Sequence, residues 1–212
     1  MGRRKGARNV DFEATKADIV SRVAHFVTET PGPHSFRSLA AAADLNAGTV
    51  RHYFGDGEGL IRAVLGFLHA RAEPMLRQAA TEVPPDVERS CREFLLGVVF
   101  GWEAGLGSIH RLGMTYGLTA PAFGPTYLDM VLEPTLRTAE ARLARHVAEG
   151  QLPALDLRAA ALTLVAPVVL ALLHQETFGG KEHRALDLGA FVERHAAWCA
   201  GAFERDGGPR PR

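Results

Sequence analysis

The chain has 212 residues, of which 47% are hydrophobic, and this composition excludes a disordered polypeptide and predicts a folded globular protein of one large or two small domains. Its 24 basic and 24 acidic residues balance, so total charge gives no argument for a nucleic-acid or membrane partner. The two cysteines, Cys91 and Cys199, lie in unrelated segments without Cys-x-x-Cys spacing. We therefore expect no disulfide framework, no metal site and no cofactor.

The amino terminus, MGRRKGAR, contains no apolar signal stretch, which predicts a cytoplasmic protein. Its basic residues have two possible roles, as a flexible solubilising tail or as an arm that reaches DNA phosphates or the minor groove; they are Arg3, Arg4, Lys5 and Arg8. The longest apolar run, residues 161–173, is 13 residues long and falls short of the roughly 20 that cross a bilayer. It predicts a helix buried on most sides, and no membrane contact.

Apolar residues recur at spacings of three and four along almost the whole chain, whereas long strand patterns are absent. This periodicity predicts an all-α fold of about nine helices. In chain order they are expected near residues 12–30, 36–43, 47–54, from the break at 55–59 to about 80, and near 85–104, 107–117, 124–149, 156–178 and 188–205. Two of these helices contain a proline, Pro134 or Pro167, and should be kinked or interrupted there.

The second and third helices form a candidate helix-turn-helix. Ser35 and Asn46 stand where their amino-terminal caps belong. Three residues connect them, and the middle one, Leu45, is apolar and should be buried between the helices. The seam between the helices is expected to consist of Leu39, Ala40, Ala43, Leu45 and Val50. In such a motif the second helix lies in the major groove of DNA.

With that seam inward, the third helix presents an outward face with groups that can contact DNA. Its residues are Ala47, Gly48, Thr49, Arg51, His52 and Tyr53. Thr49 can offer a hydroxyl or a methyl group to a base, Arg51 can reach a guanine edge or a phosphate, and Tyr53 can donate its hydroxyl to a phosphate. His52 has two possible roles, as a DNA contact or as part of a solvated face.

The segment SFRSLAAAADLNAGTVRHYFGDGEGLIRAVL, residues 35–65, resembles the DNA-binding region of the TetR family of transcriptional regulators. The resemblance implies that Ser35 and Arg37 touch the DNA from the second helix, and that the outward residues of the third helix, with Asn46 at its start, form the recognition surface. Three positions depart from the family pattern. Asp44 replaces the usual turn glycine, Arg51 replaces a common tyrosine, and Gly57 replaces a frequent lysine that contacts phosphate.

The same resemblance implies a helix-turn-helix DNA-binding domain at residues 10–56 and a carboxy-terminal ligand-binding and dimerisation domain at 57–206; residues 207–212 should be a disordered tail. Apolar and aromatic residues of the middle helices are candidates for the ligand pocket, although such a stripe is more often plain core. They are Phe94, Val98, Trp102, Met114, Tyr116, Phe123, Tyr127 and His174.

Two helices suit the contact between two copies. Helix 156–178 is apolar nearly all round, and helix 188–205 carries an aromatic face. The residues expected at this interface are Leu164, Val168, Leu172, Phe191, His195 and Trp198. The alternative is that a single chain buries them internally.

The sequence therefore predicts a homodimeric regulator, in this family most often a repressor, that binds a roughly palindromic double-stranded operator. A small apolar or aromatic effector should release it. The alternative is a helical protein-interaction adaptor that binds no DNA. No catalytic residue is expected, because the chain has no glycine-rich phosphate loop, nucleophile elbow or His/Cys cluster.

Overall fold

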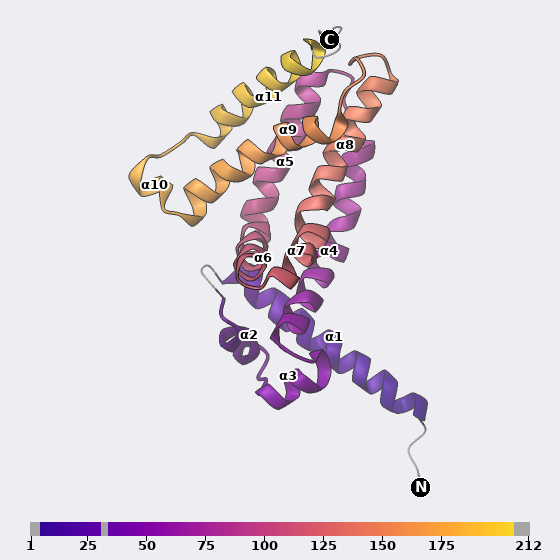
Figure 1. Ribbon diagram of the computed structural model, residues 1–212, viewed down its shortest axis with the longest axis vertical. Coiled ribbons are helices and arrows are strands. Elements are labelled where there is room, and N and C mark those ends of the chain that lie inside the picture. Colours follow the sequence, from indigo (N-terminus) through magenta and orange to yellow (C-terminus); the bar gives the residue numbers. More distant parts are fainter. Residues whose placement is uncertain (1–4, 31–33, 206–212) are drawn as a thin grey trace. The chain divides into compact units, whose positions relative to one another are not determined.

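A computed structural model describes residues 5–30 and 34–205, and within these ranges the chain is all-α, without a strand, as predicted (Figure 1). The principal helices are α1 (Lys5–Glu29), α2 (Phe36–Ala42), α3 (Ala47–Phe54), α4 (Gly57–Thr81), α5 (Val87–Gly101), α6 (Gly107–Thr119), α7 (Gly124–Tyr127), α8 (Glu133–Ala148), α9 (Leu157–Leu172), α10 (Gly180–His183) and α11 (Leu188–Arg205). Each of the nine expected ranges contains a helix. The structure adds the four-residue α10 and begins α1 at Lys5. The expected tail at 207–212, and Arg3 and Arg4, lie outside the described residues.

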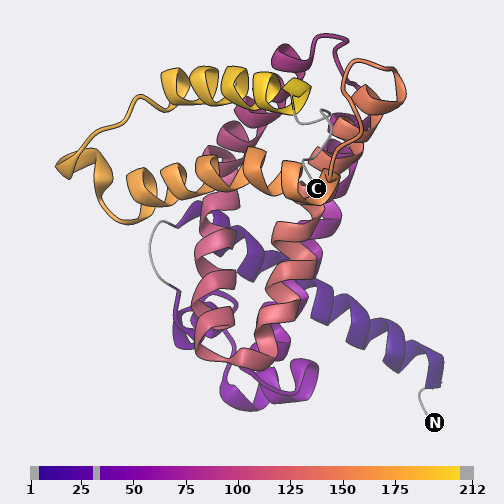
Figure 2. The same ribbon diagram turned by 45° about the horizontal axis from the view of Figure 1, so that its top comes forward.

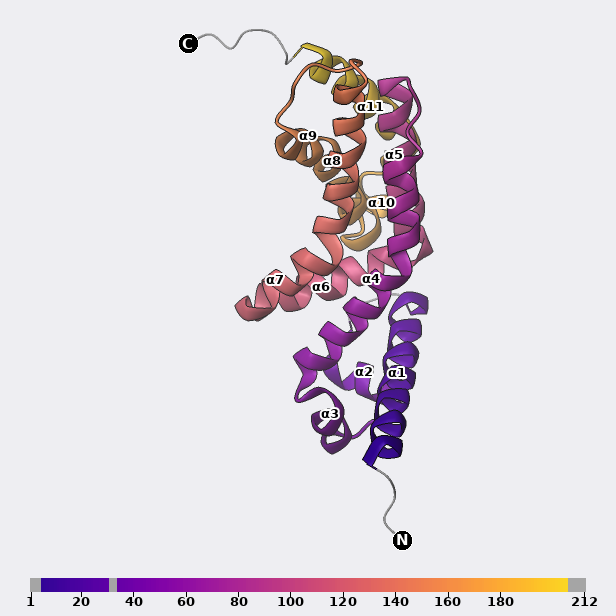
Figure 3. The same ribbon diagram turned by 90° about the vertical axis from the view of Figure 1, so that its right-hand side faces the viewer.

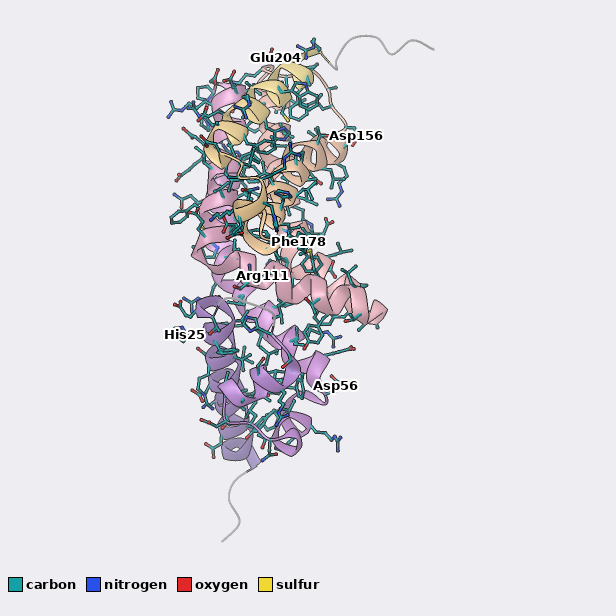
Figure 4. The ribbon with its side chains drawn as sticks, turned by 90° about the vertical axis from the view of Figure 1, so that its left-hand side faces the viewer. His25, Asp56, Arg111, Asp156, Phe178 and Glu204 are labelled. Atoms are coloured by element: carbon teal, nitrogen blue, oxygen red, sulfur yellow. The ribbon has the colours of Figure 1, made fainter. Side chains whose placement is uncertain are left out.

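Side-chain caps begin six of these helices, at the two expected residues, Ser35 and Asn46, and at four aspartates that were not singled out. An oxygen of Ser35, Asn46, Asp56, Asp86, Asp156 or Asp187 accepts a hydrogen bond from the backbone N–H three residues later. Such a bond satisfies one of the four N–H groups that the first turn of a helix leaves without a partner. Figure 4 labels two of these caps, Asp56 before α4 and Asp156 before α9.

Three short π-helical segments continue the α-helices: η1 (Trp102–Leu106), η3 (Leu128–Leu132) and η4 (Leu173–Thr177); η2 (Pro121–Phe123) is a 3-10 turn. Pro134 is the second residue of α8, which begins directly after η3, so the helical pattern changes next to the place where an interruption was expected. Pro167 lies inside α9, which continues through it as an uninterrupted α-helix. A third proline, Pro74, lies inside α4.

The chain forms two compact units, and α4 contributes to both. Unit 1 comprises residues 1–72 and 108–131, and unit 2 comprises residues 73–107 and 132–212. The functional boundary expected between residues 56 and 57 remains a prediction.

In unit 1, α1 packs on α2, as Figure 3 shows, and the start of α4 completes the core. The core side chains share a spacing of three or four residues on each helix, which places them on one face. They include Ile19, Val23, Val27, Leu39, Leu60, Ile61, Val64, Leu65 and Phe123, each at most 2% exposed.

In unit 2, α11 packs against α5 and α9, and α8 packs against α9. Figures 1 and 2 show α9 and α11 side by side, joined at one end through α10. The core of this unit contains both cysteines, Cys91 and Cys199, as free thiols. Burial raises the pKa of each thiol to about 12, so neither is a reactive thiolate at neutral pH.

Candidate nucleic-acid interface

Helices α2 and α3 form the predicted helix-turn-helix. Ser35 Oγ accepts from Ser38 N at 3.2 Å, and Asn46 Oδ1 accepts from Thr49 N at 2.9 Å. Between the helices, Leu45 N donates to Ala40 O at 2.9 Å, so the turn folds back on the end of α2. The two caps and this bond define the angle at which α3 leaves the turn.

The turn requires a left-handed residue, and Asp44 supplies it. Its φ of 54° is the only positive φ of a non-glycine residue in the described part of the chain. Aspartate tolerates this conformation better than most residues because its short polar side chain can bond locally. Arg22 of α1 lies 3.7 Å from the Asp44 carboxylate, a contact that a turn glycine could not make. The departure from the family pattern at Asp44 is therefore compatible with the turn.

The seam between the two helices is buried as predicted at four of its five positions. Leu39, Ala43 and Val50 are at most 1% exposed, and Ala40 is also buried. Leu45 was expected to be buried as well, but it is only half-buried. The small side chains of Ala40 and Ala43 let the helices approach closely, so the seam closes without Leu45 being fully enclosed.

The outward face of α3 is accessible. Gly48, Arg51 and His52 are exposed, and Thr49 and Tyr53 are partly exposed. Ser35 and Arg37, at the start of α2, are exposed too. The side chain of Ala47 lies outside the described residues.

Aromatic side chains join α1 to α3, a contact that the sequence did not lead us to expect. The Phe12 ring of α1 stacks on Tyr53, with centroids 4.8 Å apart, and meets the edge of His52 at 5.4 Å. One turn further along α1, Lys16 Nζ lies 5.9 Å from the centre of the Phe54 ring. The spacing of four between Phe12 and Lys16, both inside the expected first helix, could have revealed this shared face. The Phe12 ring covers one face of Tyr53 and limits its orientation.

At Gly57, where the family pattern has a lysine, a side chain would require the Phe36 ring to shift. A Cβ atom at this position would lie 2.7 Å from Cδ2 of the Phe36 ring. The Phe36 ring that begins α2 therefore lies against the backbone at the start of α4. Backbone N–H groups at the start of α4 remain available to an anion there.

The eight expected pocket residues are divided between the two units, four in each. In unit 1, Phe123 and Tyr127 are buried, whereas Met114 and Tyr116 are partly exposed. In unit 2, Phe94 and Trp102 are core residues, and Val98 packs against the same core. His174 was expected on a buried face; it is exposed, and its Nδ1 lies 2.7 Å from Gln175 Nε2.

A groove of about 430 Å³ lies elsewhere in unit 2, between the start of α9 and the end of α11. Its lining residues are Asp156, Ala159, Ala160, Thr163, Ala202, Phe203 and Arg205, none of which was expected in a pocket.

The expected interface residues of α9 need correction. Leu164, Val168 and Leu172 are at most 2% exposed, because they face the core of their own chain. The opposite face of α9 carries the exposed apolar side chains, Leu162 and Leu170, which are 42% and 66% exposed. Periodicity could not distinguish the two faces, because the helix is apolar on both.

The expected interface residues of α11 form a stacked row. The rings of Phe191 and His195 have centroids 5.8 Å apart, and those of His195 and Trp198 are 6.2 Å apart. His195 Nε2 lies 3.0 Å from Leu164 O, which ties the row to α9. Trp198, at the end of the row, is 60% exposed.

By length and composition, Leu157–Thr177 is long and apolar enough to cross a membrane, with a mean hydropathy of 1.9 over its most apolar window. A buried core helix passes the same test, and Leu164 and Val168 belong to the core of unit 2. Only 39% of that window is buried, so the helix is less enclosed than predicted.

In the described ranges, no group of three or more His, Cys, Asp or Glu side chains could hold a metal ion.

Neither a protein-family model nor a curated protein matches the sequence. Solved structures match at low identity. A protein from Mesorhizobium loti described as a TetR-family transcriptional regulator is 19% identical, with a TM-score of 0.65 over 95% of this chain and 97% of its own. One from Rhodococcus sp., with the same description, is 16% identical, with a TM-score of 0.61 over 90% and 99%. RolR in complex with resorcinol is 18% identical, with a TM-score of 0.53 over 96% and 98%. The chain therefore has the fold of the TetR-family transcriptional regulators.

Proposed function

We propose that this protein is a DNA-binding transcriptional regulator that reads a double-stranded operator with α3. The observation that carries the proposal is the construction of α3: a capped helix with a buried seam on one side and accessible Thr49, Arg51 and His52 on the other. Arginine and hydroxyl side chains on an exposed helix are the groups that contact base edges and phosphates in the major groove. The fold that the chain shares with TetR-family regulators supports this function.

The proposed regulator is a cytoplasmic homodimer, and its operator is roughly palindromic. A second copy would place a second α3 about one turn of DNA, roughly 34 Å, from the first. The exposed apolar residues of α9 and α11, Leu162, Leu170 and Trp198, support a contact between copies on these two helices. Phe191 and His195 belong to the same stacked row and would support Trp198 from within the chain.

The proposed output is repression, relieved by a small apolar or aromatic effector that binds among the helices after residue 57. The binding of resorcinol by RolR, which shares the fold, supports an aromatic effector. Resorcinol is accordingly the first probe. If it is close to the natural effector, it should raise the melting temperature and weaken operator binding, because a ligand stabilises the conformation that it prefers.

Selection from a randomised pool of duplexes tests DNA binding and requires no defined operator. We expect the purified chain to enrich a palindromic sequence and to lose affinity steeply as salt rises, with a log–log slope of about −0.9 per phosphate contacted. Thr49→Ala and Arg51→Ala should each weaken binding to the enriched duplex by about tenfold, within the range for loss of a base contact.

Arg89→Ala is the matched control, because Arg89 is an exposed arginine of unit 2 that pairs with Glu93. It should bind the duplex like the unsubstituted protein. A chain that enriches no duplex even at low salt would overturn the proposal and favour the protein-interaction adaptor, for which the exposed residues of α3 would be interface anchors.

A further inference from the structure

Helix α4 connects the recognition helix to unit 2, and its two ends are held differently. Its first turn follows α3 after Gly55 and Asp56, and residues 57–72 belong to unit 1. Its last residues, 73–81, belong to unit 2. Helix α4 is therefore the covalent connection between α3 and the first residues of unit 2.

Local donors cap the carboxyl end of α4 only in part: Glu82 N donates to Gln78 O at 2.8 Å, and Thr81 Oγ1 donates to Arg77 O and Gln78 O. A helix end leaves carbonyl groups without partners, which N–H groups of the next residues commonly satisfy. Here Pro84 and Pro85 follow within four residues of Thr81, and proline has no N–H to donate. Side chains from elsewhere in the chain can bond the carbonyl groups that these local donors leave.

Arginines of α8 provide those donors. The Arg142 guanidinium donates to the carbonyl oxygens of Ala79 and Glu82, the latter at 3.0 Å. Arg145 Nη1 donates to Thr81 O at 2.6 Å. Because both donors lie on α8, they join the end of α4 to a different helix, which a local cap cannot do.

Arg142 also holds α5, and it does so from a buried position. Its Nη2 donates to Ser90 O and to Ser90 Oγ, both at 3.1 Å, and its guanidinium lies 5.7 Å from the centre of the Phe94 ring. The residue is 5% exposed, and burial lowers its pKa. These partners are carbonyl and hydroxyl oxygens and an aromatic ring, not carboxylates. A buried guanidinium with such partners is costly unless every bond is kept, so α4, α5 and α8 must keep their arrangement.

Pro74 weakens α4 on the other side of this anchor. Proline cannot donate to the carbonyl of Ala70, four residues earlier, so the helix lacks one backbone bond there. The division between the two units falls between residues 72 and 73, next to this missing bond. Helix α4 is thus anchored at residues 79–82 and weakened at residue 74.

We propose that Arg142 is a positioning residue for DNA binding: by anchoring the end of α4 to α8 and α5, it sets the position from which α4 carries α3 onto DNA. The inference rests on the proposed function and adds to it the residue that couples the helices of unit 2 to the DNA-reading end of α4. Loss of the anchor lets α4 sample more orientations, and the fraction of molecules competent to bind DNA falls.

Two variants of Arg142 and one matched control test the proposal. Arg142→Met keeps an unbranched apolar stem and removes all donors, whereas Arg142→Lys keeps the charge and part of the bonding. The control is Leu143→Ala in the neighbouring position of α8, where Leu143 is 1% exposed and belongs to the core of unit 2. The control destabilises unit 2 without touching the anchor. All measurements are made well below the lowest melting temperature.

Amide hydrogen exchange without DNA reports on the anchor itself. In Arg142→Met, exchange at residues 75–82 should accelerate about tenfold or more while exchange in α9 and α11 stays unchanged, as for a local opening. In Leu143→Ala the acceleration should be spread over unit 2. Uniform acceleration in Arg142→Met, or none at residues 75–82, would overturn the assignment of Arg142 as an anchor.

Affinity for the enriched duplex reports on positioning. Arg142→Met should bind about tenfold more weakly, as expected when the competent fraction falls to a tenth, with Arg142→Lys between it and the unsubstituted protein. Leu143→Ala should bind like the unsubstituted protein. Equal weakening by Leu143→Ala, or no weakening by Arg142→Met and Arg142→Lys, would overturn the proposal while leaving the proposed function intact. Failure of the unsubstituted protein to bind any duplex would overturn both the proposed function and the role of Arg142. The unsubstituted protein is therefore measured before any variant.

Discussion

His110 and Tyr127 form a buried polar pair in unit 1. His110 Nδ1 and the Tyr127 hydroxyl are 3.0 Å apart, and both residues are at most 8% exposed. Burial lowers the pKa of His110 to about 4 and raises that of Tyr127, so both are neutral at physiological pH. Gly113 lies against the same ring, where a Cβ atom would be 2.2 Å from Cδ2 of Tyr127. The pair joins α6 to α7 through neutral hydrogen bonding.

This pair predicts a loss of stability in acid. The folded-state pKa of about 4 lies below the ordinary value of 6.5, so between these values the unfolded chain binds a proton that the folded chain does not. The free energy of unfolding therefore falls as pH falls from 6.5 to about 4, by up to roughly 1.4 kcal/mol per pH unit from this group. Denaturant unfolding at several pH values should show a shallower dependence for His110→Asn than for the unsubstituted protein. Equal slopes would contradict the assignment.

At the scale of the element, α3 depends on a cap that also lies in the expected DNA surface. Asn46 Oδ1 accepts from Thr49 N, so its oxygen is already engaged by the helix. Its NH₂ group, which donates, is free of this cap and can contact DNA. Helix stability and DNA contact at this residue are therefore separable.

Two substitutions of Asn46 separate them. Asn46→Asp keeps a good cap and should leave the melting temperature nearly unchanged, whereas Asn46→Ala should cost about 1 kcal/mol. Asn46→Asp places a negative charge beside phosphates, so it should weaken duplex binding several-fold, most strongly at low salt. Thermal denaturation and duplex titrations measure the two effects. Unchanged duplex affinity in Asn46→Asp would remove Asn46 from the recognition surface.

The exposed apolar side chains matter at the scale of the whole molecule. Leu170, Phe178 and Trp198 of unit 2 are each at least 60% exposed, and Figure 4 labels Phe178. Exposed large apolar side chains can form part of an interaction site. In the proposed function, the partner for these side chains is a second copy of the chain.

Replacement of Trp198 tests this assembly. Trp198→Glu should convert a dimer into a monomer in sedimentation at micromolar concentration, because it places a charge in an apolar contact. It should change the melting temperature of the single chain little, since the side chain is already 60% exposed. Leu118→Glu, at an 84% exposed leucine of unit 1, is the control and should remain dimeric. A monomeric unsubstituted protein, or a dimeric Trp198→Glu, would rule out this interface.

By itself the sequence determined the principal helices, the caps of α2 and α3, and the turn of the helix-turn-helix. These features depend on interactions within a few residues: Ser35 and Asn46 cap the helices they precede, and Asp44 adopts the left-handed conformation that its side chain tolerates. The inward position of Val50, and with it the outward position of Arg51, followed from the helical repeat alone.

Only the tertiary structure decided which apolar side chains form the core and which remain exposed. Leu164 and Leu170 are the same residue type on one apolar helix, yet one is buried and the other is 66% exposed, because burial depends on the neighbours that the fold supplies. Arg142 could not be identified from the sequence for the same reason. The carbonyl oxygens of Ala79 and Glu82 that it binds lie 63 and 60 residues away along the chain, and no local pattern encodes a contact across that separation.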